Sequence, residues 1–424
     1  MTGFGIGLGL GLSLAALDPS LVLSHNFAAG SLGGVTFTRA SPGTYYDSAG
    51  VLQEAAIDVP RFDYDPATGE LLGLLIEGEA ENGNLRSEEL DHGNYISARA
   101  SIDANTHVAP DGTTTMDSIL ETVDNNTHHH FHAGVTAVIG EIWTQSVYVK
   151  KLGRQYVSLT INDTSGNFLD WATFDLDAGT VESTSAGALD ATIQDVGGGT
   201  FRISMSQSVL AVSMRSHIWV RDDTGNPAVG NPYVGDITKG VVAWGWQFEK
   251  GTRASSYIKT VALAVTRNAD FPVELISALD FNLATGTLLV GLRYATEDAT
   301  RRVILAIDDG GLTDQMVLEL DTSRNVNFVT TDSVGADGLV SGTAVTSGDT
   351  LIKAAAAYAN NDIIMAVDGS LETGDATALF PATDAPTTIR YGHDSAGNHL
   401  GGHLAQAKIF NDRKSNTDLT ALSA

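Results

Sequence analysis

The chain has 424 residues, and 51 Asp and Glu against 24 Lys and Arg give it a net charge of −27. Such an acidic surface repels nucleic acid and anionic membranes, so we expect no nucleic-acid partner. The absence of cysteine excludes disulfides and thiolate metal sites. The length allows roughly two to four domains of about 100–200 residues each.

The chain begins with a stretch in which glycine alternates with apolar residues, from Gly3 to Leu14. As a strand it would place glycine on one face and an apolar row on the other. Glycine costs backbone entropy, so such a strand needs a partner. We therefore expect residues 1–35 to be an anchor that adds a strand to another protein or bundles with its own copies. The alternative is an edge strand of the protein's own first sheet. The predicted anchor residues are Phe4, Ile6, Leu8, Leu10 and Leu12.

Residues 36–85 contain two compact turn signals between apolar runs. They read Asp47-Ser-Ala-Gly50 and Asp65-Pro-Ala-Thr-Gly69. Asp and Gly at the ends of such segments favour tight turns. This region is predicted to be a hairpin module.

The rest of the chain carries short alternating runs of Val, Ile, Thr and aromatic residues, separated by Gly, Asn, Asp and Ser. This spacing is typical of sandwiches and barrels. We predict an all-β fold of tandem β-sandwiches, a jelly-roll over residues 86–265 and a second sandwich over residues 266–424. Predicted strands include Ile142–Lys150, Tyr156–Asn162, Asp170–Asp175, His217–Arg221, Val241–Phe248, Gly286–Tyr294 and His403–Phe410, with a final helical turn at Asn416–Leu422.

Three motif segments resemble a family of phage structural proteins: Phe37-Thr-Arg-Ala-Ser41, Pro60-Arg-Phe-Asp-Tyr-Asp65 and Gly73-Leu-Leu-Ile-Glu77. They look like the N-terminal module of phage and gene-transfer-agent head-spike and tail-fibre proteins. Asn84-Leu-Arg-Ser-Glu88 is similar to the Asn-rich segment that follows in that family. Glu79–Asn82 departs from the family's usual Arg-Thr-Asn run.

Further segments extend the resemblance. Ser146–Lys150, Trp244–Glu249 and Ser256–Thr260 look like the carbohydrate-binding-module jelly-roll of the same phage proteins. Asp368-Gly369 and His403–Phe410 resemble parts of a laminin-G or concanavalin-like sandwich. The resemblance implies a virion-surface fibre or spike subunit that contacts other virion proteins through its N-terminus and host cell-surface polysaccharide elsewhere. It also favours a homotrimer and does not distinguish head from tail.

All five tryptophans lie in the predicted jelly-roll. Strand parity places Ala172 and Phe174, and Ile218 and Val220, toward the core, so their neighbours point outward. Outward aromatic rings beside polar groups suit sugar binding. The alternative is that these rings pack on another subunit or domain. The predicted glycan site is Trp171, Asp175, His217, Trp219 and Arg221. Trp244, Trp246 and Phe248 are predicted to share one face in the core.

Two patterns could bind metal ions. On a strand, His128, His130 and His132 share one face, which could hold a metal or lie in a polar or intersubunit face. Three acidic clusters could supply oxygen ligands for calcium, although solvated turns have the same composition. They are Asp222-Asp223, Asp308-Asp309 and Asn360-Asn-Asp362.

No common catalytic motif is present. The nearest match to the paired-carboxylate strand of concanavalin-like glycosidases is Glu319-Leu-Asp321, but Arg324 stands where a second Glu should be. We therefore expect a non-enzymatic adhesion protein. A purely structural spike-base or decoration subunit and a capsule depolymerase stay as alternatives.

Overall fold

The computed structural model describes residues 18–165, 167–227, 232–294, 300–332, 338–346, 348–378 and 386–424. Within these ranges the chain forms strands throughout and one α-helix, α1 (Asn416–Ser423), near its end. The predicted all-β fold of tandem sandwiches is confirmed. No helix in the described part of the chain is long and apolar enough to cross a membrane.

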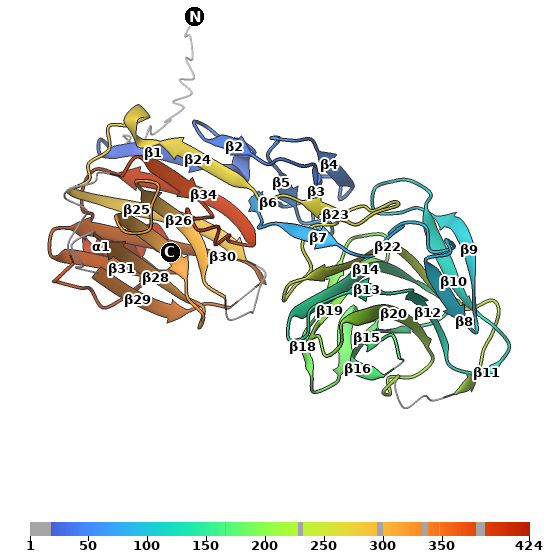
Figure 1. Ribbon diagram of the computed structural model, residues 1–424. Helices are drawn as coiled ribbons and strands as arrows, with labels where there is room; N and C mark the ends of the chain where they lie inside the picture. The colour runs from blue at the N-terminus through green and yellow to red at the C-terminus, as the bar shows by residue number, and fades with distance from the viewer. Residues whose placement is uncertain are drawn as a thin grey trace, which may run out of the picture.

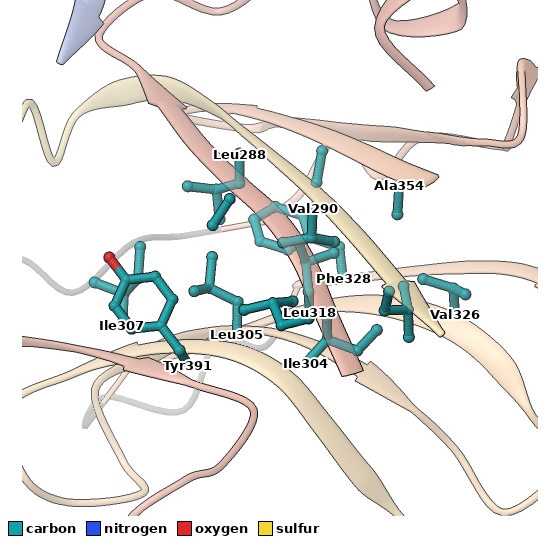
Figure 2. Close-up of a cluster of buried hydrophobic side chains, with 14 of the residues drawn as sticks. Leu288, Val290, Ile304, Leu305, Ile307, Leu318, Val326, Phe328, Ala354 and Tyr391 are labelled. Carbon is teal, nitrogen blue, oxygen red and sulfur yellow. The ribbon is translucent and has the colours of Figure 1, made fainter. Parts of the chain in front are cut away.

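The C-terminal sandwich consists of two antiparallel sheets around one apolar core. The first sheet has the order β32 (Ser370–Leu371), β31 (Asp362–Val367), β30 (Gly348–Ala359), β25 (Thr285–Tyr294), β34 (Gly402–Phe410), β6 (Leu71–Ile76) and β5 (Phe62–Tyr64), with β1 (Leu21–Asn26) also paired to β34. The second has the order β2 (Thr36–Thr38), β24 (Phe271–Leu275), β33 (Thr388–Tyr391), β26 (Arg302–Asp308), β27 (Gln315–Leu320), β28 (Asn325–Thr331) and β29 (Gly338–Ala344). Figure 2 shows Leu288 and Val290 of β25 in this core with Leu305 and Leu318 of the opposite sheet.

The middle sandwich is built from residues 95–250. One sheet has the order β18 (Ala188–Asp195), β19 (Thr200–Ser208), β14 (Ile142–Leu152), β22 (Gly240–Lys250), β10 (Met116–Glu121) and β9 (Ala100–His107). The other, called the β20 sheet below, has the order β17 (Thr180–Thr184), β16 (Phe168–Asp175), β15 (Tyr156–Asp163), β20 (Ser213–Arg221), β12 (His128–His132) and β8 (Tyr95–Ala98), with β13 (Val135–Thr136) beside β20. Val147, Leu159, Ile203 and Trp246 belong to the core between the sheets.

The N-terminal segments do not form the separate units that the sequence predicts. In Figure 1, β1 lies beside β34 at the other end of the chain, and the register pairs Leu23 with Ile409. Strands β6 and β2 likewise pair with β34 and β24. The predicted boundaries at residues 35 and 85 are therefore wrong for these strands, because pairing across more than 200 residues leaves no local signal. The anchor residues Phe4 to Leu12 lie outside the described residues, and their role stays a prediction.

The predicted hairpin turns are confirmed. Strands β3 (Gly43–Tyr46) and β4 (Leu52–Ala55) are joined by a turn in which Gly50 N donates to Asp47 O over 2.9 Å. The turn between β5 and β6 closes with Gly69 N donating to Asp65 O over 2.8 Å. Two further ribbons pair β7 (Ala80–Asn82) with β23 (Val265–Arg267) and β11 (Asn125–Asn126) with β21 (Tyr233–Val234).

The charged residues of the phage-like motif form a buried ionic network beside these turns. Asp270, at the start of the C-terminal sandwich, accepts from Arg39 over 3.1 Å and from Arg61 over 2.5 Å. Arg61 also donates to Glu77 over 2.8 Å. Charges this deeply buried are tolerated only when they are paired and hydrogen-bonded. The motif residues thus fasten the hairpin module to the C-terminal sandwich.

A bulge in β22 changes the predicted packing of its aromatic residues. Trp244, Trp246 and Phe248 are all buried, as predicted, but Trp246 lies in the core between the sheets while Trp244 packs in a separate cluster with Tyr148. Gly245 between them has a φ of +62°, a left-handed conformation that suits glycine. The parity of the strand therefore shifts at this residue.

Candidate functional site

The predicted glycan residues lie on the outer face of the β20 sheet, the face turned away from the core. Ala172, Phe174, Ile218 and Val220 are core residues, so the parity prediction is confirmed. The strand registers align the outward residues in rows across β12, β20, β15 and β16. One row contains His129, Trp219, Ser158 and Thr173, and the next contains Phe131, His217, Thr160 and Trp171.

The rings on this outer face pack on one another. His129 stacks on Trp219 with 4.0 Å between ring centroids, and Phe131 stacks on His217 with 4.6 Å. Trp219 Nε1 donates to Thr160 Oγ1 over 3.0 Å. Trp219 is therefore only 3% exposed and His217 only 6%. The predicted exposure of both is wrong, since β12 supplies rings that the parity of β20 alone does not reveal.

The two charged residues of the predicted site are also enclosed. Arg221 is buried and donates to Asp223 and to Gly225 O. Asp175 is buried and accepts from the backbone N–H groups of Asp177 and Ala178, which closes the turn after β16. Trp171 alone of the predicted set is half-buried. The outer face therefore presents little of the surface that a sugar ring would need.

The histidines on the other face of β12 pack inward. His130 stacks on Tyr95 with 5.4 Å between ring centroids, and His132 meets the edge of the same ring at 5.2 Å. Burial lowers the pKa of both imidazoles to about 4, so they are neutral at pH 7. His128 makes a 2.6 Å hydrogen bond with Arg99 O. The described residues of one chain contain no group of three or more potential ligands arranged for a metal, so the site at His128, His130 and His132 stays a prediction without support.

The acidic clusters carry arginine partners. Asp308 accepts from Arg390 over 2.7 Å, and Asp362 accepts from Arg413 over 2.9 Å. Asp223 accepts from Arg221. These ion pairs give the calcium prediction no support.

The two carboxylates of the segment that most resembles a glycosidase strand, Glu319 and Asp321, also have hydrogen-bond partners within the protein. Glu319 accepts from Arg301 Nε over 2.6 Å. Asp321 accepts from the backbone of Ser323 and Asn325 in the turn between β27 and β28. Both carboxylates thus have structural roles.

A cavity of about 420 Å³ lies where the hairpin β3–β4, the middle sandwich and the C-terminal sandwich meet. We call it the junction cavity. The middle sandwich contributes Tyr148 and Arg202, and the C-terminal sandwich contributes Arg302 and His403. Five tyrosines line it: Tyr45, Tyr46, Tyr64, Tyr148 and Tyr257. Tyr46, Tyr148 and Tyr257 are buried, whereas Tyr45 and Tyr64 are half-buried, so the last two are the rings that a ligand could contact.

Two carboxylates at the junction cavity are held by consecutive serines. Ser256 Oγ donates to Glu77 over 2.7 Å, and Ser255 Oγ donates to Glu249 over 2.6 Å. Burial favours a raised pKa at both carboxyls. At Glu77 the guanidinium groups of Arg267 and Arg61 reverse this effect and hold the pKa well below its usual value. At Glu249 burial prevails, and the pKa is raised. One wall therefore carries an ionised carboxylate beside one that is more easily protonated.

Arg202 of β19 lines the same cavity. Its guanidinium lies over the ring of Tyr148 at 5.4 Å, and its Nη2 donates to Ser146 Oγ over 3.1 Å. Its Nε is buried without a hydrogen-bond partner, and Arg202 makes no ion pair with a carboxylate in the described ranges. Burial would lower the pKa of this guanidinium, but nearby Tyr148, Tyr46 and Glu249 raise it, so Arg202 stays charged.

A second cavity of about 610 Å³ is lined in part by Arg39. Its lining includes Asp58, Phe271 and His399. The guanidinium of Arg39 is already bonded to Asp270 and to backbone carbonyls of the hairpin module. This cavity offers fewer aromatic rings than the junction cavity.

The junction cavity could not be identified from strand parity, since its residues come from both sandwiches and the hairpin module. A partial signal was present. Ser146–Lys150, Trp244–Glu249 and Ser256–Thr260, which carry the carbohydrate-module resemblance, supply Tyr148, Glu249 and Ser256 to its wall.

The chain matches no family model and no curated protein. Among solved structures it is similar to the Ruminococcus gnavus IT-sialidase CBM40 bound to α2,3-sialyllactose, with 12% identity, 34% of this chain and 84% of that chain covered, and a TM-score of 0.28. The Trypanosoma rangeli sialidase in complex with the inhibitor DANA has 10% identity, covers 73% of this chain and 60% of its own, and has a TM-score of 0.29. Mouse laminin α1 domains LG4-5 have 12% identity, cover 68% and 86%, and have a TM-score of 0.21. Similarity at this level assigns no function to the chain.

Proposed function

We propose that the protein is a non-enzymatic glycan-binding subunit and that a saccharide occupies the junction cavity. The observation that carries this proposal is the cavity itself, with its five tyrosines and a buried set of carboxylate and guanidinium groups. Sugars are bound by aromatic faces that pack on the ring C–H groups and by a few fixed polar groups that bond the hydroxyls. The junction cavity has both in one place.

The cavity would give a modest affinity for a single sugar unit. Tyr45 and Tyr64 are half-buried, so each can present part of a ring to a ligand without losing its own packing. Several copies on one particle raise the effective concentration and make attachment avid. This favours a protein that acts in multiple copies on a surface.

The location on a virion surface is part of the proposal and rests on the phage-like motif. The residues of that motif, Arg39, Arg61 and Glu77, form a buried ionic network. Such a network suits an appendage that must hold a binding surface away from the particle. We also propose attachment to other virion proteins through Phe4–Leu12 and assembly as a homotrimer, as the resemblance implies.

Glycan binding is tested on a glycan array and by calorimetry with the best ligand. The double variant Tyr45→Ala/Tyr64→Ala should lose binding by about tenfold or more, because each lost ring contact is worth about 0.5–1.5 kcal/mol. Trp171→Ala is the matched control, since Trp171 is a half-buried ring outside the cavity. A loss of binding in Trp171→Ala with unchanged binding in the double variant would place the site on the β20 sheet instead.

A hydrolytic activity is the second candidate, and the opposed pKa shifts of Glu77 and Glu249 favour it. Glycosidases use one ionised and one protonated carboxyl group in this way. However, both carboxylates are already hydrogen-bonded by serines. We expect no release of reducing ends from bound polysaccharide. Release that disappears in Glu249→Gln would make the protein a depolymerase.

A further inference from the structure

We propose that the junction cavity selects saccharides that carry a carboxylate and that Arg202 is the residue that binds this group. The inference rests on the proposed glycan function and adds the ligand's chemical class. Its basis is the position of Arg202 in the cavity wall, with an unpartnered Nε and no carboxylate in an ion pair with it among the described residues. A guanidinium is a planar, charged donor group that suits the two oxygens of a carboxylate.

Most other charges around the cavity are already committed to partners within the protein. Lys250 donates to Glu141 over 2.6 Å, and Arg253 donates to Asp190 over 3.4 Å. Arg267 pairs with Glu77 at 3.5 Å. These three cations have carboxylate partners within 4 Å, and Arg202 has none among the described residues. A ligand carboxylate would therefore meet an uncompensated guanidinium at Arg202.

Three of the four acidic residues in the wall also have partners within the protein. Asp63 is 2.9 Å from His403, and Glu77 accepts from Arg61 over 2.8 Å. Glu249 accepts from Ser255 and Gln247. The lining contains five Arg and Lys against four Asp and Glu, whereas the whole chain has 24 against 51. The cavity is thus far less acidic than the rest of the protein, which permits an anionic ligand to approach.

The surroundings of Arg202 favour an anionic sugar over a small inorganic anion. Tyr148 stacks against the guanidinium and holds its plane, while other tyrosine rings line the same space. A saccharide can place its carboxylate on Arg202 and its ring C–H groups on a tyrosine at the same time. Inorganic phosphate or sulfate would gain only the first of these contacts.

The test uses an array of matched pairs, each with an acidic glycan and its neutral counterpart, such as trigalacturonate with its methyl ester and 3′-sialyllactose with lactose. We expect the full-length protein to prefer the acidic member. Arg202→Gln should weaken the best acidic ligand about 10- to 100-fold, the range of a charge-assisted hydrogen bond, and change neutral ligands less than about threefold. Arg202→Lys keeps the positive charge but loses the paired N–H donors of the guanidinium, so it should recover only part of the affinity for the acidic ligand.

Arg215→Gln is the control variant, because it removes the same charge outside the cavity, on β20. Circular dichroism and thermal unfolding check that each variant is folded. If Arg202→Gln does not fold, Arg202→Lys is used as the test variant in its place. Binding of neutral members without dependence on Arg202 would overturn this inference and leave the proposed function standing. Binding to no member of either kind would overturn the proposed function, and the inference with it. Inhibition by inorganic phosphate as strong as that by the acidic glycan would identify a simple anion site and also overturn the inference.

Discussion

The outer face of the β20 sheet and the junction cavity have similar chemistry but leave different amounts of open space. Both combine aromatic rings with arginine, carboxylate and hydroxyl groups. On the β20 sheet, His129 stacks on Trp219 and Phe131 stacks on His217, so the ring faces are covered by other rings of the protein. At the cavity, Tyr148 packs against Tyr257 and bonds Tyr46, while the half-buried Tyr45 and Tyr64 line open space. An aromatic and polar composition therefore indicates an interaction, and packing from distant strands decides whether its partner is the protein or a ligand.

The polar groups follow the same division. On the β20 sheet, Arg221 and Asp175 bond neighbouring turns. At the cavity, serines and Arg61 donate to the carboxylates, while Arg202 has no carboxylate partner among the described residues. The outer face of the β20 sheet is therefore a structural element. The junction cavity has open space for a ligand.

The largest expected effect is on the ionic network behind the cavity. Asp270→Ala leaves Arg39 and Arg61 buried without their shared carboxylate. We expect the free energy of unfolding to fall by about 3–5 kcal/mol in urea denaturation. Asp177→Ala, which breaks an exposed pair with Lys151, should cost less than about 1 kcal/mol. Equal costs for the two variants would show that the network does not hold the joint.

The next effect separates the two tryptophans on the β20 sheet. Trp219→Ala removes a ring that is 3% exposed and stacked on His129, so we expect a cost of about 3 kcal/mol. Trp171→Ala removes a half-buried ring and should cost about 1 kcal/mol. Neither should change the affinity for glycan. Similar melting temperatures for the two variants would contradict the description of Trp219 as a structural residue.

The last effect is a difference in the pH dependence of stability between the two regions. The pKa of His130 and that of His132 are lowered by burial from 6.5 to about 4, so below pH 6.5 the unfolded chain takes up protons that the folded chain cannot. Stability is therefore lost as the pH falls from 6.5 toward 4, by roughly 1–3 kcal/mol per histidine. Glu77 has a lowered pKa, so its contribution is lost only as the pH falls below its unfolded value of 4.5.

This pH dependence is measured by urea denaturation between pH 7 and pH 5, where ordinary carboxylates stay ionised. We expect the double variant His130→Gln/His132→Gln to show a flatter profile than the unmodified protein, whatever its absolute stability. His92→Gln is the control, since His92 lies outside this packed row. A profile of unchanged slope in the double variant would show that these imidazoles do not limit stability.

Local sequence patterns predicted much of the fold. The alternation of apolar residues identified β15, β20 and β25, and the Asp and Gly signals located both hairpin turns. Parity correctly assigned which face Trp171 and Trp219 occupy. It went wrong at Trp244, because Gly245 introduces a bulge that resets the alternation.

Features that depend on distant segments could not be predicted in the same way. Strand β1 pairs with β34 across almost the whole chain, and His129 reaches Trp219 from a neighbouring strand. The junction cavity is the extreme case, since Tyr45, Arg202 and His403 come from three parts of the sequence with no shared pattern. Residue types indicated the chemistry of binding, while only the assembled fold shows where space is left for a ligand.

The most direct test is a crystal structure of the protein in complex with the best acidic ligand from the array. The account predicts electron density for a sugar in the junction cavity, with its carboxylate bonded to Arg202 and its ring against one of the lining tyrosines. Density for the sugar over Trp171 on the outer face of the β20 sheet, with the junction cavity free of ligand, would contradict the account.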